Sequence, residues 1–169
     1  MRLYLIRHAE AEGADDDLPD HDRPLTGDGQ QQARALGVWL AQRGVRPSLV
    51  YCSSARRALE TAREMLSELP RGAEPNTSRD LYLASARQLL ELVRETPSAH
   101  ASLWIVGHNP GMAELALRLA GQGESQALRR MAARFPPAAC AQITFSHDGW
   151  HAIEPGAGKL AGYWTPAVE

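Results

Sequence analysis

Consecutive apolar residues without polar alternation form three short runs along the chain, at residues 3–6, 49–52 and 103–106. Such runs are typical of strands buried on both faces, as in a parallel sheet covered by helices. A shorter strand is expected within residues 74–78. Two more, at residues 139–145 and 150–153, are predicted to pair through the turn His147-Asp148-Gly149.

Between these runs, apolar residues recur with the spacing of a helix face. Thr26 is a candidate N-cap for the first helix, and Gly44 is expected to end it. Its predicted apolar face consists of Ala33, Leu36, Gly37 and Leu40. Similar patterns, with Ser54 and Ser85 as predicted N-caps, indicate further helices at residues 54–69, 85–94, 110–120 and 124–134.

The order of these elements predicts the fold class. Strands alternate with helices and two strands follow at the end, which favours an α/β protein: a three-layer α/β/α sandwich with a mostly parallel central sheet and an antiparallel edge. Gly72 is expected in a loop, and residues 156–169 show no pattern that assigns them to an element. Without an internal repeat or a linker, residues 1–169 are expected to form a single domain.

Ionisable side chains follow the three predicted buried strands. Arg7 and His8 end the first, Arg57 comes soon after the second, and His108 follows the third. Because the carboxyl ends of parallel strands lie at one edge of a sheet, where ligands bind, we expect these four side chains to meet. Arginine forks and a helix N-terminus favour phosphate, and a neutral imidazole is a competent nucleophile toward phosphorus. The pattern predicts phosphoryl transfer without a metal, because fixed cations supply the positive charge.

The same three segments resemble the histidine phosphatase superfamily. Residues 5–10, Leu-Ile-Arg-His-Ala-Glu, resemble its RHG or RHA signature, and residues 53–62 resemble its S-P-x-x-R-A-x-x-T-A segment with Ser54 where proline is usual. Residues 106–111, Val-Gly-His-Asn-Pro-Gly, resemble its second-histidine segment. The short chain and the sequence Asp-Arg-Pro-Leu-Thr at residues 22–26 are similar to SixA-type phosphohistidine phosphatases. The resemblance spans residues 1 to about 145 and implies a phosphoglycerate mutase-like fold.

Residue matching to this family implies a set of site residues. His8 would be the phosphorylated nucleophile, and Arg7, Arg57 and His108 would complete the phosphate pocket. Arg56 is not the arginine of the motif, and on a helix only one of two neighbours can face a pocket squarely. The resemblance implies no metal and no other cofactor.

The loop after the short strand expected within residues 74–78 departs from the pattern of larger family members, which carry an acidic proton donor there. Asp80 is the only acid of residues 79–85. An alkoxide leaving group needs a general acid, whereas phosphohistidine leaves as imidazole once its ring is protonated. A protein phosphohistidine is therefore the favoured substrate. Small phosphomonoesters, with Asp80 as acid, are an alternative, and a non-catalytic phosphoprotein-binding module is another.

Residues 10–22 form an acidic stretch that includes five aspartates and His21. We predict a solvated loop here, not a metal site, because nothing in the sequence fixes the geometry of the ligands. Arg23 is expected to steady this loop, and Ser53 is expected to fix the turn after its strand.

Composition narrows the functional class. A net charge of −2 over 169 residues gives no reason to expect nucleic acid or a membrane as partner. Cys52 and Cys140 have neither zinc spacing nor a disulfide framework and are expected to be reduced thiols. The start of the chain does not resemble a signal peptide, which favours the cytoplasm. The expected partners are a phosphohistidine-bearing protein in signal transduction, such as a phosphotransfer domain, or a small phosphorylated substrate, with inorganic phosphate as product.

Overall fold

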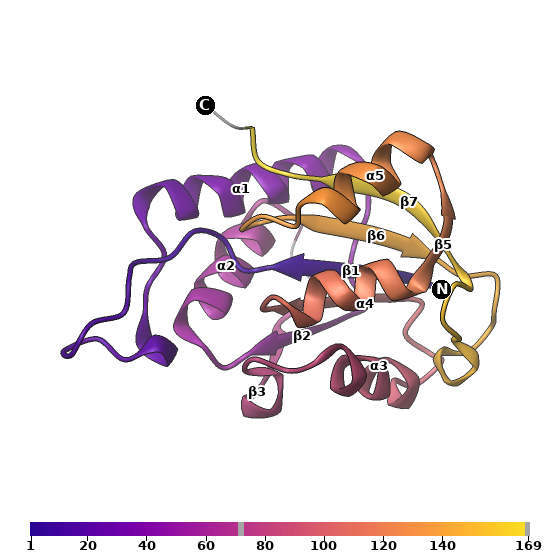
Figure 1. Ribbon diagram of the computed structural model, residues 1–169, viewed down its shortest axis with the longest axis horizontal. Coiled ribbons are helices and arrows are strands. Elements are labelled where there is room, and N and C mark those ends of the chain that lie inside the picture. Colours follow the sequence, from indigo (N-terminus) through magenta and orange to yellow (C-terminus); the bar gives the residue numbers. More distant parts are fainter. Residues whose placement is uncertain (71–72, 168–169) are drawn as a thin grey trace.

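The computed structural model describes residues 1–70 and 73–167 (Figure 1). Its strands are β1 (Arg2–Arg7), β2 (Leu49–Ser53), β3 (Pro75–Ser78), β4 (Ser102–Gly107), β5 (Ala120–Gly123), β6 (Cys140–Thr144) and β7 (Gly158–Trp164). Its α-helices are α1 (Gly27–Gln42), α2 (Arg56–Ser67), α3 (Ala86–Glu95), α4 (Gly111–Leu119) and α5 (Ser125–Ala133). Short 3-10 helices are η1 (Asp20–Asp22), η2 (Arg79–Leu81) and η3 (Trp150–Ala152). The loop expected at Gly72 lies outside the described residues.

The seven strands form one sheet in the order β3-β2-β4-β1-β6-β7-β5. The first four are parallel to one another, β6 is antiparallel to both β1 and β7, and β5 is parallel to β7. The predicted α/β fold with a mostly parallel sheet and an antiparallel edge is therefore confirmed.

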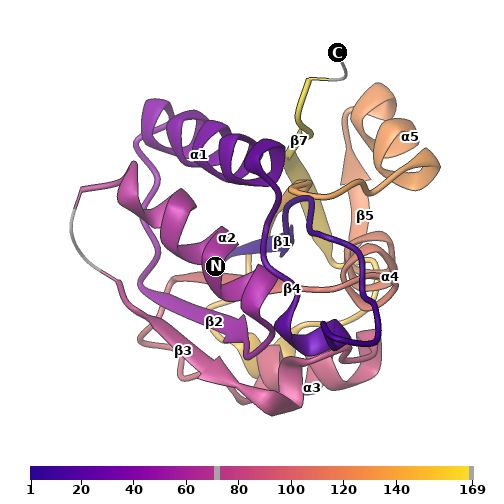
Figure 2. The same ribbon diagram turned by 90° about the vertical axis from the view of Figure 1, so that its left-hand side faces the viewer.

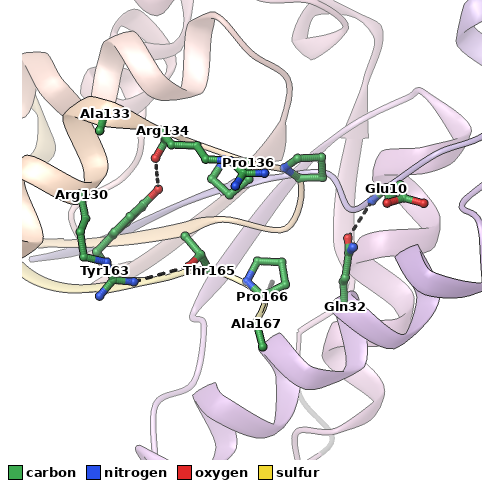
Figure 3. A pocket seen from close by; sticks show the side chains of 11 residues that line it. Glu10, Gln32, Arg130, Ala133, Arg134, Pro136, Tyr163, Thr165, Pro166 and Ala167 are labelled. Atoms are coloured by element: carbon green, nitrogen blue, oxygen red, sulfur yellow. Dashed lines mark hydrogen bonds between the residues drawn. The ribbon is translucent and has the colours of Figure 1, made fainter. Parts of the chain in front are cut away.

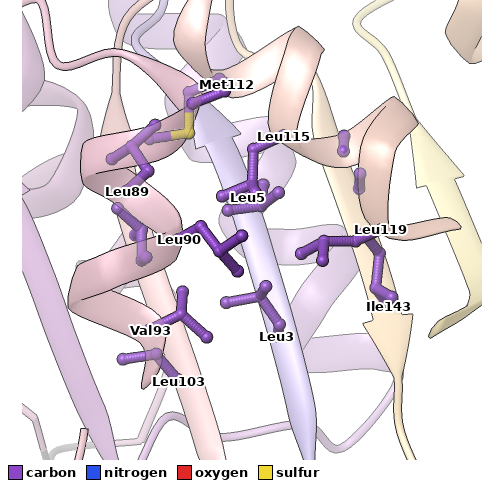
Figure 4. Close-up of a cluster of buried hydrophobic side chains, with 14 of the residues drawn as sticks. Leu3, Leu5, Leu89, Leu90, Val93, Leu103, Met112, Leu115, Leu119 and Ile143 are labelled. Carbon is purple, nitrogen blue, oxygen red and sulfur yellow. The ribbon is translucent and has the colours of Figure 1, made fainter. Parts of the chain in front are cut away.

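Strand β1 contributes side chains to two cores, which explains its unbroken apolar run. Leu3 and Leu5 pack with α3 and α4 on one face, where Figure 4 shows them against Leu90 and Leu115. Tyr4 and Ile6 point to the opposite face, where α1 and α2 lie side by side (Figure 2). They pack there with side chains such as Leu36, Leu40, Met65 and Trp104. All four β1 side chains are fully buried. Burial on both sides holds the strand in register, and the register decides where Arg7 and His8 are delivered.

The predicted helix signals are largely confirmed. The Oγ1 atom of Thr26 accepts a hydrogen bond from the Gly29 amide, and Ser85 forms a capping box with Gln88. Gly44 adopts a φ of +63°, the left-handed conformation in which a helix often ends. The predicted cap at Ser54 is wrong: Ala55 is the N-cap of α2, and the Ala55 amide donates to the Oγ of Ser53.

The predicted hairpin of residues 139–145 and 150–153 is wrong in its second strand. Residues 150–152 form η3, and Trp150 is buried in the core with its indole N–H donating to the carbonyl of His100 at 2.7 Å. The strand that pairs with β6 is β7, in the stretch that showed no pattern. The alternation of apolar and polar residues in β7 is not visible in the sequence, because glycine occupies a buried position. A Cβ at Gly158 would lie 2.4 Å from Cγ2 of Ile143.

None of the helices in residues 1–70 and 73–167 has both the length and the apolar character needed to cross a membrane. Cys52 and Cys140 are buried free thiols, as the sequence predicts.

Candidate active site

Three neighbouring strands deliver the candidate site residues to one edge of the sheet. His8 follows β1 and His108 follows β4, and these strands pair up to Arg7 and Gly107. Strand β2 lies on the other side of β4 and leads into α2, whose first turn carries Arg57. His8, Arg57 and His108 are all buried, with exposures of 8%, 3% and 3%. The expected convergence at the carboxyl edge is present in the structure.

His8 is held in one tautomer by its own backbone. Its Nδ1 lies 2.7 Å from the carbonyl oxygen of Ala9. A carbonyl only accepts hydrogen bonds, so Nδ1 must carry the proton and Nε2 must present a lone pair. The Nε of Arg57 donates to that Nε2 at 3.3 Å. The unprotonated nitrogen of His8 therefore points into the cationic cluster.

Arg57 connects the cluster. Its Nη2 donates to Nδ1 of His108 at 3.3 Å, while its Nε donates to Nε2 of His8. Its neighbour Arg56 points outward, with 56% of its side chain exposed and an ion pair to Glu60. As the helix geometry predicted, only one of the two arginines faces the pocket.

His108 is oriented by two partners. Its Nδ1 accepts from Arg57, which has only donors, so its Nε2 carries the proton and donates to the Oγ of Ser53 at 2.7 Å. The same Ser53 oxygen accepts the Ala55 amide at 3.2 Å. Ser53 thus fixes both the turn and the second histidine, and the two imidazole ring centroids lie 5.2 Å apart.

Arg7 is half-buried at the end of β1. Its Nη1 donates to the carbonyl of Phe135 at 3.0 Å, and Nδ2 of Asn109 donates to the same oxygen at 2.8 Å. Its Nε is buried without a hydrogen-bond partner within the described part of the chain. Burial and the nearby charge of Arg57 lower the pKa of Arg7. An unpaired buried donor beside His8 suits an incoming oxyanion, because that oxyanion would satisfy it.

Sequence reasoning missed Asp20, which lies in η1. Its backbone oxygen accepts from Nη1 of Arg57 at 2.5 Å, and its Oδ2 accepts from Nη2 at 3.1 Å. The hydroxyl of Tyr82 donates to the same Oδ2, and Arg23 donates to Oδ1 at 2.9 Å. Arg23 also donates to the carbonyl of Glu12, so it steadies the loop as expected. No sequence pattern distinguishes Asp20 from its acidic neighbours.

Two more side chains support the cluster from outside it. Thr61 is fully buried; its Oγ1 accepts the Ala9 amide at 2.9 Å and donates to the Arg57 carbonyl at 2.7 Å, which ties the end of β1 to α2. His21, from η1, has its Nε2 2.9 Å from the Oγ of Ser54. The acidic loop between β1 and α1 is therefore docked on the strand ends at η1, although Figure 1 shows much of it extending past them.

Asp80 lies elsewhere. It lines a cavity of about 540 Å³ with Tyr51 and Gln88, and its amide donates to the Oγ of Ser78. Another cavity, of about 440 Å³, lies between the C-terminal segment and α5 (Figure 3). Its lining includes Glu10 and Tyr163 but none of the four predicted site residues. Within residues 1–70 and 73–167, no group of three or more His, Cys, Asp or Glu side chains could hold a metal ion.

Both histidines are poorly basic. Burial is the main reason that the pKa of His8 falls from 6.5 to about 4; the bond to Ala9 opposes this fall, while Arg57 and Arg7 add to it. Burial likewise lowers the pKa of His108 to about 3, with His8 and Arg57 contributing. Both rings are therefore neutral at physiological pH, and Nε2 of His8 carries no proton.

We expect both rings to remain neutral at about pH 5.5, well below the ordinary histidine pKa. In the unfolded chain the same rings gain protons below about pH 6.5, so the unfolded state binds more protons and stability falls as pH drops toward 4. Nitrogen-15 NMR of the imidazoles, with His8→Ala and His108→Ala for assignment, measures the protonation directly. A midpoint near 6.5 for either ring would contradict the burial argument.

The sheet thus places two neutral histidines and two arginines at its carboxyl edge, an arrangement that can accept an oxyanion. The sequence profile of the histidine phosphatase superfamily (branch 1) matches residues 3–82. An uncharacterized protein of Mycobacterium tuberculosis is 30% identical over 163 residues, which cover 95% of this chain and 99% of that protein. The chain belongs to the histidine phosphatase superfamily.

Within that superfamily the chain is of the SixA type. The structure of the SixA protein from Nakamurella multipartitia has a TM-score of 0.85 at 26% identity and covers 99% of this chain and 96% of its own. The protein histidine phosphatase SixA complexed with tungstate matches in fold, with a TM-score of 0.76 at 21% identity over 96% of both chains. The family and these neighbours support a phosphatase.

Proposed function

We propose that this protein is a metal-independent phosphatase that removes phosphoryl groups from protein phosphohistidine through a phosphohistidine intermediate on His8. The observation that carries the proposal is the tautomer of His8: with its proton held on Nδ1 by Ala9, its Nε2 offers a lone pair inside a pocket of arginines. Arg7 and Arg57 are the proposed donors to the transferring oxygens. His108 would join them once the negative charge of the phosphoryl group favours a proton on its Nδ1, the nitrogen that accepts from Arg57 in this structure.

The first step follows from this arrangement. The Nε2 lone pair of His8 forms a bond to phosphorus as the phosphorus–nitrogen bond of the substrate breaks, and that electron pair returns to the departing imidazole. The departing ring is neutral because its other nitrogen already carries a proton. His8 keeps its Nδ1 proton, so its phosphorylated ring is cationic and is itself a good leaving group.

Water completes the cycle. Its oxygen attacks the phosphorus on His8, the bond from phosphorus to Nε2 breaks, and the electron pair returns to His8. The proton released by water goes to phosphate or solvent, and inorganic phosphate is the product. The arginines contribute by neutralising the equatorial oxygens, which is the principal demand of phosphoryl transfer.

Neither acid considered as a proton donor, Asp20 or Asp80, is suited to that role, which supports phosphohistidine over alkyl phosphates as the substrate. The hydrogen bond from Tyr82 and the charge of Arg57 lower the pKa of Asp20 to about 2, so this carboxylate cannot donate a proton near neutral pH. Asp80 lines a separate cavity. An alkoxide leaving group would need a proton that neither acid supplies, whereas the imidazole of a protonated phosphohistidine leaves as a neutral ring without one. A phosphohistidine-bearing protein, such as a phosphotransfer domain, is the proposed partner in the cytoplasm.

A substrate comparison tests this proposal. We expect a phosphotransfer domain phosphorylated on histidine to be turned over with a kcat/KM at least about 100-fold above that of sugar phosphates, because alkoxide departure lacks a proton donor. The control is Asp80→Asn, which should leave both activities unchanged. Equal or faster hydrolysis of the sugar phosphates, with loss of that activity in Asp80→Asn, would favour the phosphomonoesterase alternative.

A further inference from the structure

Asp20 is bound to the centre of the cluster and also to groups outside it. Two of its oxygens accept from Arg57: the backbone oxygen and Oδ2. Its carboxylate is also bound by Arg23 through Oδ1 and by Tyr82 through Oδ2. A phosphoryl group that takes over the donors of Arg57 therefore leaves the carboxylate with two other partners, so it can shift off Arg57 and remain beside the site.

The exposure of these groups shows on which side of the pocket Asp20 lies. The Arg57 side chain is 3% exposed and that of Asp20 is 41% exposed, so the carboxylate lies between the guanidinium and solvent. His8 is also buried, with 8% exposure, so a protein substrate can reach it only from the solvent side. In an in-line displacement the leaving group lies opposite the attacking nitrogen. A group leaving from phosphorus attacked by His8 therefore departs toward the solvent side, where Asp20 and Tyr82 are.

We propose that Asp20 is a specificity-determining residue, whose carboxylate faces the leaving group and selects those that depart carrying a proton over those that depart as anions. This inference rests on the proposed function and deepens it. When the phosphorus–nitrogen bond breaks, the electron pair goes to the departing nitrogen, and the proton on the other ring nitrogen stays there while Asp20 accepts a hydrogen bond from it. A carboxylate in the same place repels a departing phenolate or alkoxide.

The ionisation of Asp20 agrees with this role. Tyr82 and Arg57 lower its pKa to about 2, so it carries its charge throughout the physiological range. The pKa of Tyr82 is raised, chiefly by its hydrogen bond to Asp20, so the phenol remains a donor to the carboxylate. Asp20 thus keeps an ionised carboxylate on the solvent side of Arg57, where it also pairs with Arg23.

Two phosphoryl donors of different leaving-group charge test the proposal. N-phosphorylimidazole releases imidazole and p-nitrophenyl phosphate releases a phenolate, and neither leaving group requires a general acid. We expect Asp20→Asn to lower the ratio of kcat/KM for N-phosphorylimidazole over p-nitrophenyl phosphate by about tenfold. The effect is near the solvated limit for one charge at contact distance, because the Asp20 side chain is 41% exposed and water screens it. Asp22→Asn is the matched control: Asp22 lies in the same short helix, is 65% exposed and pairs with His21. It should leave the ratio unchanged.

Different results would contradict the role of Asp20 and the proposed phosphatase function. If Asp20→Asn slows both donors equally, Asp20 only positions Arg57 and the specificity role is overturned. The same holds if Asp20→Asn and Asp22→Asn give the same ratio. If the wild-type protein hydrolyses p-nitrophenyl phosphate but neither N-phosphorylimidazole nor a phosphohistidine protein, the proposed substrate class fails first, and this inference fails with it.

Discussion

The His8→Ala variant is expected to lose turnover of every phosphorylated substrate, by a factor on the order of 10⁴ or more in kcat. The reason is that the hydrogen bond from Nδ1 to the Ala9 carbonyl leaves Nε2 of His8 unprotonated and directed toward Arg57. Without it, phosphate release would need water to attack the substrate directly. Steady-state phosphate release from a phosphohistidine protein measures the loss, and thermal unfolding shows whether the variant still folds.

His100→Ala provides a matched control for this change. His100 precedes the amino end of β4, and its Nδ1 contacts the backbone oxygen of Ser48, at the opposite edge of the sheet from His8. It also loses an imidazole, yet we expect its kcat to remain near that of the wild type. Substantial turnover in a folded His8→Ala protein would exclude His8 as the nucleophile.

Removal of Arg57 is expected to have the next largest effect. Arg57→Ala should lower kcat/KM by about 10³-fold or more, the scale at which a single arginine acts in phosphoryl transfer. Its guanidinium contacts both histidines, so the variant loses a ligand for the transferring oxygens and the group that orients the two rings. Arg57→Lys should recover little, because an ammonium cannot reproduce a planar fork of donors.

Arg56→Ala is the matched control for Arg57→Ala. Arg56 is adjacent in sequence, carries the same charge and lies in the same helix, but its partner is Glu60 on the surface. Exposed pairs of this kind contribute little to stability, about 0–1 kcal/mol. We expect Arg56→Ala to change kcat/KM by less than about threefold, consistent with a screened surface charge. Similar losses in the two variants would show that net charge, and not the geometry of Arg57, produces the effect.

The convergence of the four site residues was predictable from sequence for a physical reason. Strands β1 and β4 are buried on both faces, and β2 is buried on one face and half-buried on the other, so their apolar runs are continuous. Parallel strands have their carboxyl ends at one edge of the sheet. The choice of Arg57 over Arg56 came from the resemblance to the family's segment, and helix geometry explains why only one of the two faces the cluster.

What the sequence could not supply depends on contacts made at long range. Asp20 binds Arg57, 37 positions away, and Tyr82, 62 positions away, and nothing local distinguishes it from Asp22. Strand β7 was missed because Gly158 fills a buried position where a larger side chain would have shown the alternation. The segment at Trp150 looked like a strand because its apolar residues are buried, although they are buried as a 3-10 turn.

The most direct test of the central claim is detection of the phosphorylated enzyme. The wild-type protein is mixed with a phosphohistidine protein or N-phosphorylimidazole, quenched in alkali within milliseconds and analysed by mass spectrometry. We predict one added phosphoryl group, labile to acid and mapped to His8, that forms and decays at rates consistent with turnover and is absent from His8→Ala. Turnover without such an adduct, or an adduct on His108 instead, would contradict the mechanism.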